Sequence, residues 1–185
     1  FAKPGYQLVD RALQMGVEMV RPQVVDKDQR ICEIQNICDL SLAVRMRNDD
    51  KTLKRPGDII VKNEVNMNNQ GRIFIITGPN QGGKTTYTRS IGMAQVLFQA
   101  GLYVPGTKAR MSPVDKLFTH FPKEEERRVD EGRLGEELRE LSEIVDSITP
   151  NSMVLLNESL SSTSAYDSLV ICENLMKAFR SIGLR

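Results

Sequence analysis

The chain has 185 residues, of which 40% are apolar and 26% are charged, and these values are typical of a folded globular domain. Its 25 Lys and Arg residues nearly balance its 24 Asp and Glu residues, so net charge gives no reason to expect general attraction to nucleic acid or anionic membranes. No apolar stretch approaches the roughly 18 to 20 residues of a membrane span, and no signal-peptide pattern is present, which favours a cytoplasmic protein. The three cysteines lack paired spacing, which argues against a disulfide framework or a zinc site.

The first part of the chain predicts a short helix and then a small β region. Apolar residues at helical spacing indicate a helix from Tyr6 to Met15, within a lead-in of residues 1–18 that we expect to come from a preceding domain. From Met19 to Val65 the pattern changes to short β-branched segments broken by Pro, Gly, Asn and Asp, which predicts mostly antiparallel strands. These segments are Val24–Val25, Ile31–Ile34 and Ile59–Val61.

After Val65 the pattern becomes an alternation of strands and helices. The run Ile73–Ile76 is apolar at every position, as expected for a strand buried on both faces, and Met153–Leu156 has the same character. Helices are predicted from Lys84 to about Ala100 and around the apolar residues between Leu138 and Ile148. We therefore expect an α/β fold with a mostly parallel core sheet flanked by helices.

A glycine-rich loop lies between the first of these apolar runs and the following helix. Residues 78–85 fit the pattern GxxxxGK[ST], in which backbone N–H groups and a helix N-terminus bind phosphates. Lys84 is expected to reach the β- and γ-phosphates, Thr85 to ligate Mg²⁺, and Thr86 to contact the next phosphate back. The loop therefore predicts binding of ATP or ADP with Mg²⁺. Its cofactor-binding residues are Gly78, Pro79, Asn80, Gln81, Gly82, Gly83, Lys84, Thr85 and Thr86.

A second polar site follows the apolar run Met153–Leu156. Asn157 stands where phosphate-loop enzymes usually carry an Asp, so we expect it to hold the metal through a bound water rather than directly. Glu158 is predicted to help bind the metal and to orient or deprotonate the attacking water, which makes it a catalytic candidate together with Lys84. The polar stretch from Ser159 to Ser164 fits either a turn beside the γ-phosphate or a simple loop.

These residues resemble a known family. Residues 77–86, Thr-Gly-Pro-Asn-Gln-Gly-Gly-Lys-Thr-Thr, are similar to the TGPNxGGKST motif of the MutS mismatch-repair ATPases, which is narrower than the general loop pattern. Three further blocks follow in the family's order: residues 101–105, residues 113–119, and residues 155–167, which resemble its LMDE…GTSTYDG stretch. The resemblance implies an ATPase domain of the ABC type over residues 19–185, truncated at its C-terminus, with Ile60 on a short strand near the adenine.

The resemblance also implies a partner subunit. Residues 132–137 stand where the family carries a signature that reaches the γ-phosphate of a second subunit, but the usual serine is missing. Gly132, Arg133 and Gly135 are therefore the expected contacts to that phosphate. Together with Asn157, this departure suggests a divergent MutS-like branch. The family's nucleotide-sensing histidine would lie beyond Arg185, and His120 is interpreted as an ordinary residue.

The implied function is ATP binding and hydrolysis in a DNA mismatch-repair protein, where ATP-driven closure of a homodimer controls DNA binding. Residues 123–133 mix positive and negative charges, so we expect DNA contacts mostly outside this fragment, nucleoid association when DNA is bound, and no membrane partner. Two alternatives remain open: a nucleotide-gated switch with little hydrolysis, and another ABC-type chromosome or recombination ATPase. The chain begins at Phe1 without an initiator Met, so we expect a fragment that is weakly active or inactive alone.

Overall fold

The computed structural model describes residues 4–68, 71–121, 133–158, 160 and 163–184. The chain divides into two compact units, one up to Pro113 and the other from Val114, and each is described by itself below. The predicted domain boundary between residues 18 and 19 stays a prediction. Among the helices of the described ranges, none is both long and apolar enough to cross a membrane.

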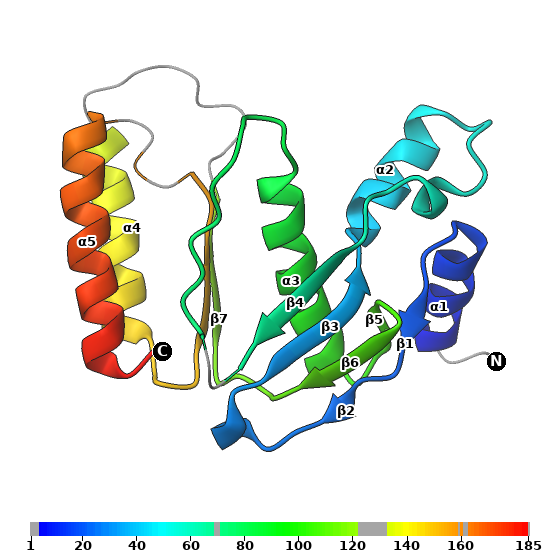
Figure 1. Ribbon diagram of the computed structural model, residues 1–185, viewed down its shortest axis with the longest axis horizontal. Coiled ribbons are helices and arrows are strands. Elements are labelled where there is room, and N and C mark those ends of the chain that lie inside the picture. The colour runs from blue at the N-terminus through cyan, green and yellow to red at the C-terminus, as the bar shows by residue number, and fades with distance from the viewer. Residues whose placement is uncertain (1–3, 69–70, 122–132, 159, 161–162, 185) are drawn as a thin grey trace. The chain divides into compact units, whose positions relative to one another are not determined.

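The first unit is built on a four-stranded sheet with the strand order β2-β6-β3-β4 (Figure 1). β3 (Cys32–Ile37) pairs antiparallel with both β4 (Asn63–Met67) and β6 (Lys108–Met111), while β2 (Gln23–Val24) pairs parallel with β6. A separate antiparallel pair joins β1 (Met19–Val20) to β5 (Val104–Pro105). The sheet is therefore mixed and mainly antiparallel.

Three α-helices belong to this unit. α1 (Pro4–Gln14) is the predicted lead-in helix, and its Ala12 packs in a core cluster with Met15, Val17 and Ile60. α2 (Leu40–Asp49) begins after Asp39, whose carboxylate accepts hydrogen bonds from two backbone N–H groups of the first turn. α3 (Lys84–Gln99) follows the glycine-rich loop, as predicted. Two short 3₁₀ helices, η1 (Lys27–Gln29) and η2 (Pro56–Asp58), lie in the connections.

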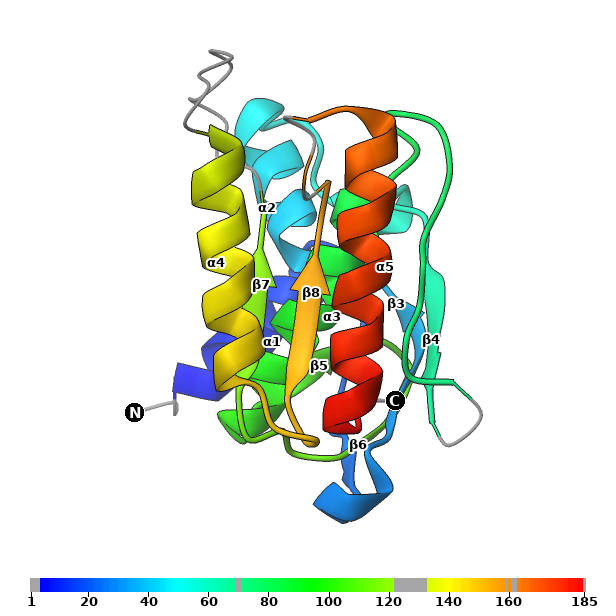
Figure 2. The same cartoon turned by 90° about the vertical axis from the view of Figure 1, so that its left-hand side faces the viewer.

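The second unit contains two strands and two helices. β7 (Leu117–His120) and β8 (Met153–Leu156) form a parallel pair, with His120 opposite Leu156 at its carboxyl end. α4 (Arg133–Ser147) and α5 (Ala165–Ile182) run beside the two strands (Figure 2). The core between them is apolar and includes Leu141, Leu160 and Phe179.

The predicted fold class is wrong in its central feature. A mostly parallel core sheet was expected around Ile73–Ile76, but this run forms no strand, and Phe74, Ile75 and Ile76 are 48%, 78% and 41% exposed. The only parallel pairs among the described strands are β2–β6 and β7–β8. Apolar character at every position reports a tendency to be buried, whereas a strand needs backbone partners on a neighbouring segment.

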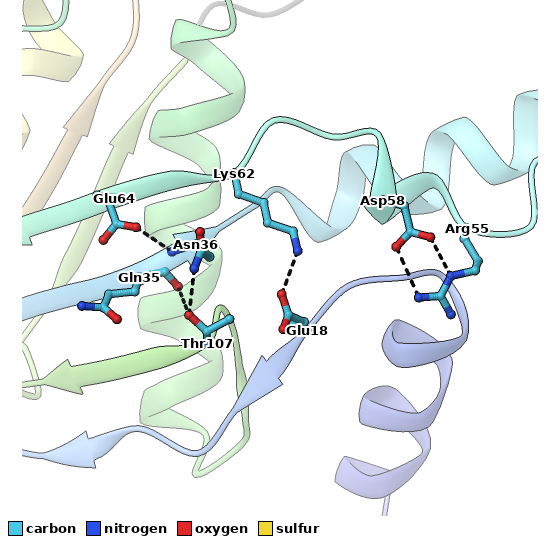
Figure 3. Close-up of polar contacts among 8 residues, drawn as sticks. All are labelled: Glu18, Gln35, Asn36, Arg55, Asp58, Lys62, Glu64 and Thr107. Atoms are coloured by element: carbon cyan, nitrogen blue, oxygen red, sulfur yellow. Dashed lines mark hydrogen bonds and ion pairs between the residues drawn. The ribbon is translucent and has the colours of Figure 1, made fainter.

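A second strand prediction is also wrong. Ile59–Val61 was expected to be extended, but Ile59 follows the 3₁₀ helix η2 and the strand starts only at Asn63. Figure 3 shows the polar contacts that hold this connection: Arg55 Nε lies 2.6 Å from Asp58 Oδ2, and Lys62 Nζ lies 2.7 Å from Glu18 Oε2. These contacts fix a turn where the β-branched pattern alone favoured a strand.

Candidate functional site

The loop from Gly78 to Gly83 has a backbone that few side chains would permit. Gly78 and Gly83 have φ values of 152° and 83°, and Gln81 also has a positive φ, of 63°. At Gly82, an added Cβ atom would lie 2.9 Å from the carbonyl oxygen of Pro79, which accepts the Gly82 N–H at 3.1 Å. The glycines at positions 78, 82 and 83 are thus required by the tight path of the loop.

The helix that follows the loop begins without a side-chain cap. Gly83 is the N-cap residue of α3, and as a glycine it has no side chain to accept a hydrogen bond from the first turn. By contrast, α2 is capped by Asp39 and α5 by Ser164. An uncapped first turn presents backbone N–H groups and the positive end of the helix dipole, and both attract anions.

Lys84 lies at the first position of α3 and folds back over the loop. Its ammonium group donates hydrogen bonds to the carbonyl oxygens of Gly78, at 2.9 Å, and Pro79, at 2.8 Å. Lys84 is partly buried, and Thr85 and Thr86 are partly buried beside it, whereas residues 78–83 are exposed. The structure therefore gathers a cation, two hydroxyl-bearing residues and an exposed loop at one helix N-terminus.

Tyr87 anchors this helix start to the sheet. Its hydroxyl donates a hydrogen bond of 2.8 Å to the carbonyl oxygen of Glu64 on β4, and burial raises the pKa of Tyr87. The Glu64 side chain in turn accepts the backbone N–H of Asn36 at 3.1 Å, and Asn36 Nδ2 donates to Thr107 Oγ1 at 3.0 Å (Figure 3). Asn36 has a φ of 55° at an irregularity in the β3–β4 pairing. A chain of hydrogen bonds thus links α3 to β4, to β3 and to the turn that contains Thr107.

Ile60, expected near the adenine, lies in the core of the first unit. It is 9% exposed and packs in the cluster that contains Ala12 and Met15. Its neighbours Ile59 and Val61 are 62% and 77% exposed. Contact between Ile60 and a base stays a prediction, and the exposed apolar surface at this point comes from the two neighbours.

Asn157 and Glu158 follow β8 in the second unit. The backbone N–H of Asn157 donates to the His120 carbonyl oxygen at 2.9 Å, which extends the β7–β8 pairing by one residue, and Asn157 is buried. Glu158 is exposed and has a φ of 49°, a left-handed conformation that side-chain-bearing residues seldom adopt. Backbone strain of this kind costs on the order of 1–3 kcal/mol and is concentrated at functional sites.

The polar stretch after Glu158 includes a helix cap. Ser164 Oγ accepts the backbone N–H of Asp167 at 3.1 Å and donates to Asp167 Oδ2 at 2.7 Å, so this serine begins α5. Ser168 Oγ donates to the carbonyl oxygen of Leu160 at 2.8 Å, and Leu160 is 1% exposed. Ser159 lies outside the described residues. The described part of this stretch therefore supports the interpretation as a structural turn.

The expected contacts to a second subunit lie at the start of α4. Gly132 and the whole mixed charge run before it fall outside the described residues. Arg133 is the first residue of α4, and Gly135 stands in its first turn with open space at its Cβ position. Their role toward a partner's phosphate stays a prediction.

The donor set fits Mg²⁺ in chemical type. Thr85, Asn157 and Glu158 offer hydroxyl, amide and carboxylate oxygens, and Mg²⁺ binds oxygen while usually keeping several waters and substrate phosphates. Within the described ranges, no group of three or more His, Cys, Asp or Glu residues could hold a metal ion. Thr85 belongs to the first unit, and Asn157 and Glu158 belong to the second, so a shared role in binding Mg²⁺ stays a prediction.

One polar pair escaped the sequence reasoning. His120, interpreted as ordinary, is buried at the carboxyl end of β7, and its Nε2 lies 3.2 Å from Glu140 Oε2 on α4. The two residues are separated by 20 positions and no spacing rule connects them. The sequence offered one indirect signal for this contact: a helix that follows a parallel strand usually packs on that strand.

Comparisons with known proteins give a family match that includes the glycine-rich loop. A family profile described as MutS domain V matches residues 74–183. Two proteins described as DNA mismatch repair protein MutS, from the serovars Copenhageni and Lai of Leptospira interrogans serogroup Icterohaemorrhagiae, are each 34% identical over 131 residues. The match covers 70% of this chain and 15% of each relative, so the chain spans a small part of their length. The chain belongs to the MutS family and contains its domain V.

Proposed function

We propose that this chain binds ATP with Mg²⁺ and hydrolyses it within a MutS-like DNA mismatch-repair protein. The observation that carries the proposal is the uncapped N-terminus of α3 behind the loop 78–83, with the Lys84 ammonium held over the loop. Phosphate oxygens placed there would accept hydrogen bonds from the backbone N–H groups. They would also replace the carbonyl oxygens of Gly78 and Pro79 as the acceptors for Lys84. The names of the relatives support the repair context.

In this proposal each remaining residue has a separate task. Thr85 ligates Mg²⁺, Asn157 holds a metal-bound water, and Glu158 accepts a proton from the attacking water or orients it. The metal neutralises charge that develops on the phosphates. The strained backbone of Glu158 supports its assignment, because such strain persists only where the surrounding structure maintains it.

The test is direct binding of MgATP, measured by titration calorimetry. Lys84→Ala should weaken binding about 100-fold, since it removes a charge-assisted contact worth roughly 3 kcal/mol. Lys177→Ala is the matched control, because Lys177 is an exposed helical lysine paired with Glu173 on the same helix, and this variant should bind MgATP as the wild type does. Equal affinity in the wild type and Lys84→Ala would refute the phosphate site.

Hydrolysis is proposed to need two copies of the full-length protein. Gly132, Arg133 and Gly135 of one copy would contact the γ-phosphate held by the other, and dimer closure would control DNA binding by other regions. Single-turnover phosphate release by the full-length protein tests this step. Glu158→Gln should abolish release and spare MgATP binding, and release at the wild-type rate in this variant would exclude Glu158 as the catalytic carboxylate.

A nucleotide-gated switch with little hydrolysis is the second candidate. It is favoured by Asn157, a buried amide that brings no negative charge to the metal. Asn157→Asp should then raise phosphate release from a near-zero wild-type rate. A wild-type protein that releases phosphate in a single turnover would exclude the switch.

A further inference from the structure

Two buried polar residues meet at the carboxyl end of the strand pair in the second unit. His120 and Asn157 are each 8% exposed, and among the residues described for this unit they are the buried ones with polar side chains. His120 ends β7, Asn157 directly follows β8, and the Asn157 N–H donates to the His120 carbonyl oxygen at 2.9 Å. The core around them is apolar. Polar groups buried together in such a core indicate a role beyond filling space.

The side chain and the carbonyl group of His120 contact different neighbours. His120 lies opposite Leu156 in the strand register, so its side chain shares the face of Leu156 and Phe118, which pack against the core formed with α4 and α5. On that face, His120 Nε2 lies 3.2 Å from Glu140 Oε2. The His120 carbonyl oxygen instead accepts the Asn157 N–H. His120 therefore connects α4 to the residue that follows β8.

Glu140 is held in place by the packing of α4, which lies beside β7 (Figure 2). The Glu140 side chain is 41% exposed, and the next residue, Leu141, is 4% exposed and packs with Phe179 in the core. A contact between two groups on packed elements is directional, so it sets the distance from α4 to the end of β7. An apolar side chain at position 120 would fill the same space without setting that distance.

The position of Asn157 affects Glu158 through one peptide bond. Consecutive Cα atoms are about 3.8 Å apart, so a shift of the Asn157 backbone moves Glu158 as well. Glu158 has a φ of 49°, and a backbone conformation of this kind persists only when the surrounding structure maintains it. The hydrogen bond from Asn157 to His120 is a contact of that kind, made immediately before the strained residue.

We propose that His120 is a positioning residue whose contact with Glu140 fixes the end of β7 and thereby places Asn157 and Glu158 for hydrolysis. The catalytic consequence rests on the proposed function, whereas the link from Glu140 to Asn157 does not. His120 touches no substrate in this assignment and acts through its carbonyl oxygen. Neutral and charged imidazole can both donate from Nε2, so the link does not depend on protonation.

The first test is hydrogen exchange at the Asn157 N–H, measured by NMR in the ¹⁵N-labelled, nucleotide-free chain. Glu140→Ala removes the contact and favours the helix, and it should speed this exchange about tenfold. Glu140→Gln keeps an oxygen acceptor and should stay within about threefold of wild type. The N–H of Leu175, in the middle of α5, should keep its rate, which separates local loosening from lost global stability.

The matched control is Glu143→Ala, which removes an exposed carboxylate one turn further along α4. It should leave the exchange rate of the Asn157 N–H within about twofold of wild type, because surface charges alone have small effects.

The second test is single-turnover phosphate release by the full-length protein at saturating MgATP. Glu140→Ala should slow release about tenfold, because a small misplacement of a catalytic group lowers the rate of the chemical step. Its affinity for MgATP should stay within about twofold of wild type. Glu140→Gln should restore most of the rate. A role in folding alone would not separate rate from affinity, and would not respond to the retained acceptor.

Two outcomes would overturn the link: an unchanged Asn157 exchange rate in Glu140→Ala, and equal effects of Glu140→Ala and Glu143→Ala, which would assign the change to the charge of α4. A wild-type rate of phosphate release in Glu140→Ala would refute the positioning role and leave the proposed function intact. Absence of release in the wild-type protein would refute hydrolysis and the catalytic role together, and the exchange rates would still confirm or refute the link.

Discussion

Gly82 lies at a tight point of the loop 78–83, which is proposed to bind phosphate. A Cβ atom at this position would meet the Pro79 carbonyl oxygen at 2.9 Å, and that oxygen also accepts hydrogen bonds from the Gly82 N–H and from Lys84. A side chain at Gly82 would therefore displace the carbonyl that positions the lysine. The loop is sensitive to one methyl group although residues 78–83 are all exposed.

Gly82→Ala should weaken MgATP binding about tenfold, because the loop must shift away from the added methyl group. The control is Gly71→Ala, where the nearest atom to the added Cβ is the end of the Phe74 ring at 3.8 Å. Calorimetric titration of both variants gives the comparison. Wild-type affinity in Gly82→Ala would show that the loop changes shape when nucleotide binds.

The three thiols differ in their surroundings. Burial raises the pKa of Cys32 to about 12 and also raises the pKa of Cys38, while Cys172 is exposed on α5. Only the thiolate reacts with alkylating reagents. Iodoacetamide at pH 8 should therefore label Cys172 first and leave Cys32 and Cys38 protected, as peptide mass spectrometry would show. Rapid labelling of Cys32 in the folded chain would contradict its burial.

The same pKa shifts predict loss of stability in alkali. The folded state keeps its proton at Cys32 to higher pH than the unfolded state, so the unfolded state binds fewer protons above its own pKa. The free energy of unfolding should be unaffected below about pH 8.5 and should fall as the pH rises from there toward 12. Cys32→Ala should reduce this slope between pH 9 and 10, measured by urea denaturation. An unchanged slope would assign the alkaline loss to other groups.

At the scale of elements, helix N-termini differ in whether a side chain caps them, and the N-terminus proposed to bind phosphate has no such cap. Asp39 is 3% exposed, and its Oδ1 accepts the N–H groups of Ser41 and Leu42 at 2.8 and 3.2 Å. Ser164 serves α5 in the same way. α3 has no such side chain. Its first turn is the one that combines a glycine-rich approach with uncapped N–H groups.

Asp39→Ala should lower the free energy of unfolding by about 1–2 kcal/mol, since it leaves two N–H groups of the first turn of α2 without their side-chain acceptor. Asp49→Ala is a suitable control, because Asp49 is an exposed acid at the C-terminal end of the same helix, where the dipole disfavours negative charge. It should be neutral or slightly stabilising. Urea denaturation measures both, and equal stability of the two variants would exclude the cap as the cause.

The elements differ in how well the sequence predicts them. α3 and β8 match their predicted ranges, because a glycine-rich start and a short apolar run bounded by polar residues are strong local signals. The strand at Ile73–Ile76 and the one at Ile59–Val61 are absent, and α2 was not predicted. α2 arises from the Asp39 cap in a stretch whose apolar spacing is weak. Pairing partners and caps, rather than hydrophobic pattern, decide these segments.

The candidate sites also differ in how well the sequence predicts them. The proposed phosphate-binding loop is contiguous in sequence, so its residue types and spacing are enough to predict it, and phosphate binding itself stays a prediction. The His120–Glu140 pair joins β7 to α4 in the second unit, and only the fold brings these two side chains together. Such sites depend on pairs of residues far apart along the chain. One sequence does not reveal these pairs.

At the scale of the whole molecule, the chain contains two units with separate cores. One core cluster surrounds Ala12 and Ile60, and another surrounds Leu141 and Phe179. A third group of buried residues in the sheet of the first unit includes Ile34 and Val65, each 1% exposed. Each unit therefore has apolar contacts that the other does not supply.

Leu141→Ala should destabilise the second unit by about 2–5 kcal/mol, the usual range when a buried leucine is truncated. Hydrogen exchange followed by mass spectrometry should show lost protection in residues 133–184 and unchanged protection in β3 and β4. Val65→Ala should give the reverse pattern. Loss of protection across both units in either variant would show that the chain unfolds as one cooperative body.

The hydrogen bonds from Lys84 to Gly78 and Pro79 bear on how strongly the proposed site would bind a phosphate. The loop supplies two carbonyl acceptors for the ammonium group from its own backbone. A phosphate that bound Lys84 would have to replace these two acceptors. The contribution of Lys84 to affinity would therefore be the difference between a phosphate and a carbonyl acceptor, which is smaller than the full strength of a salt bridge.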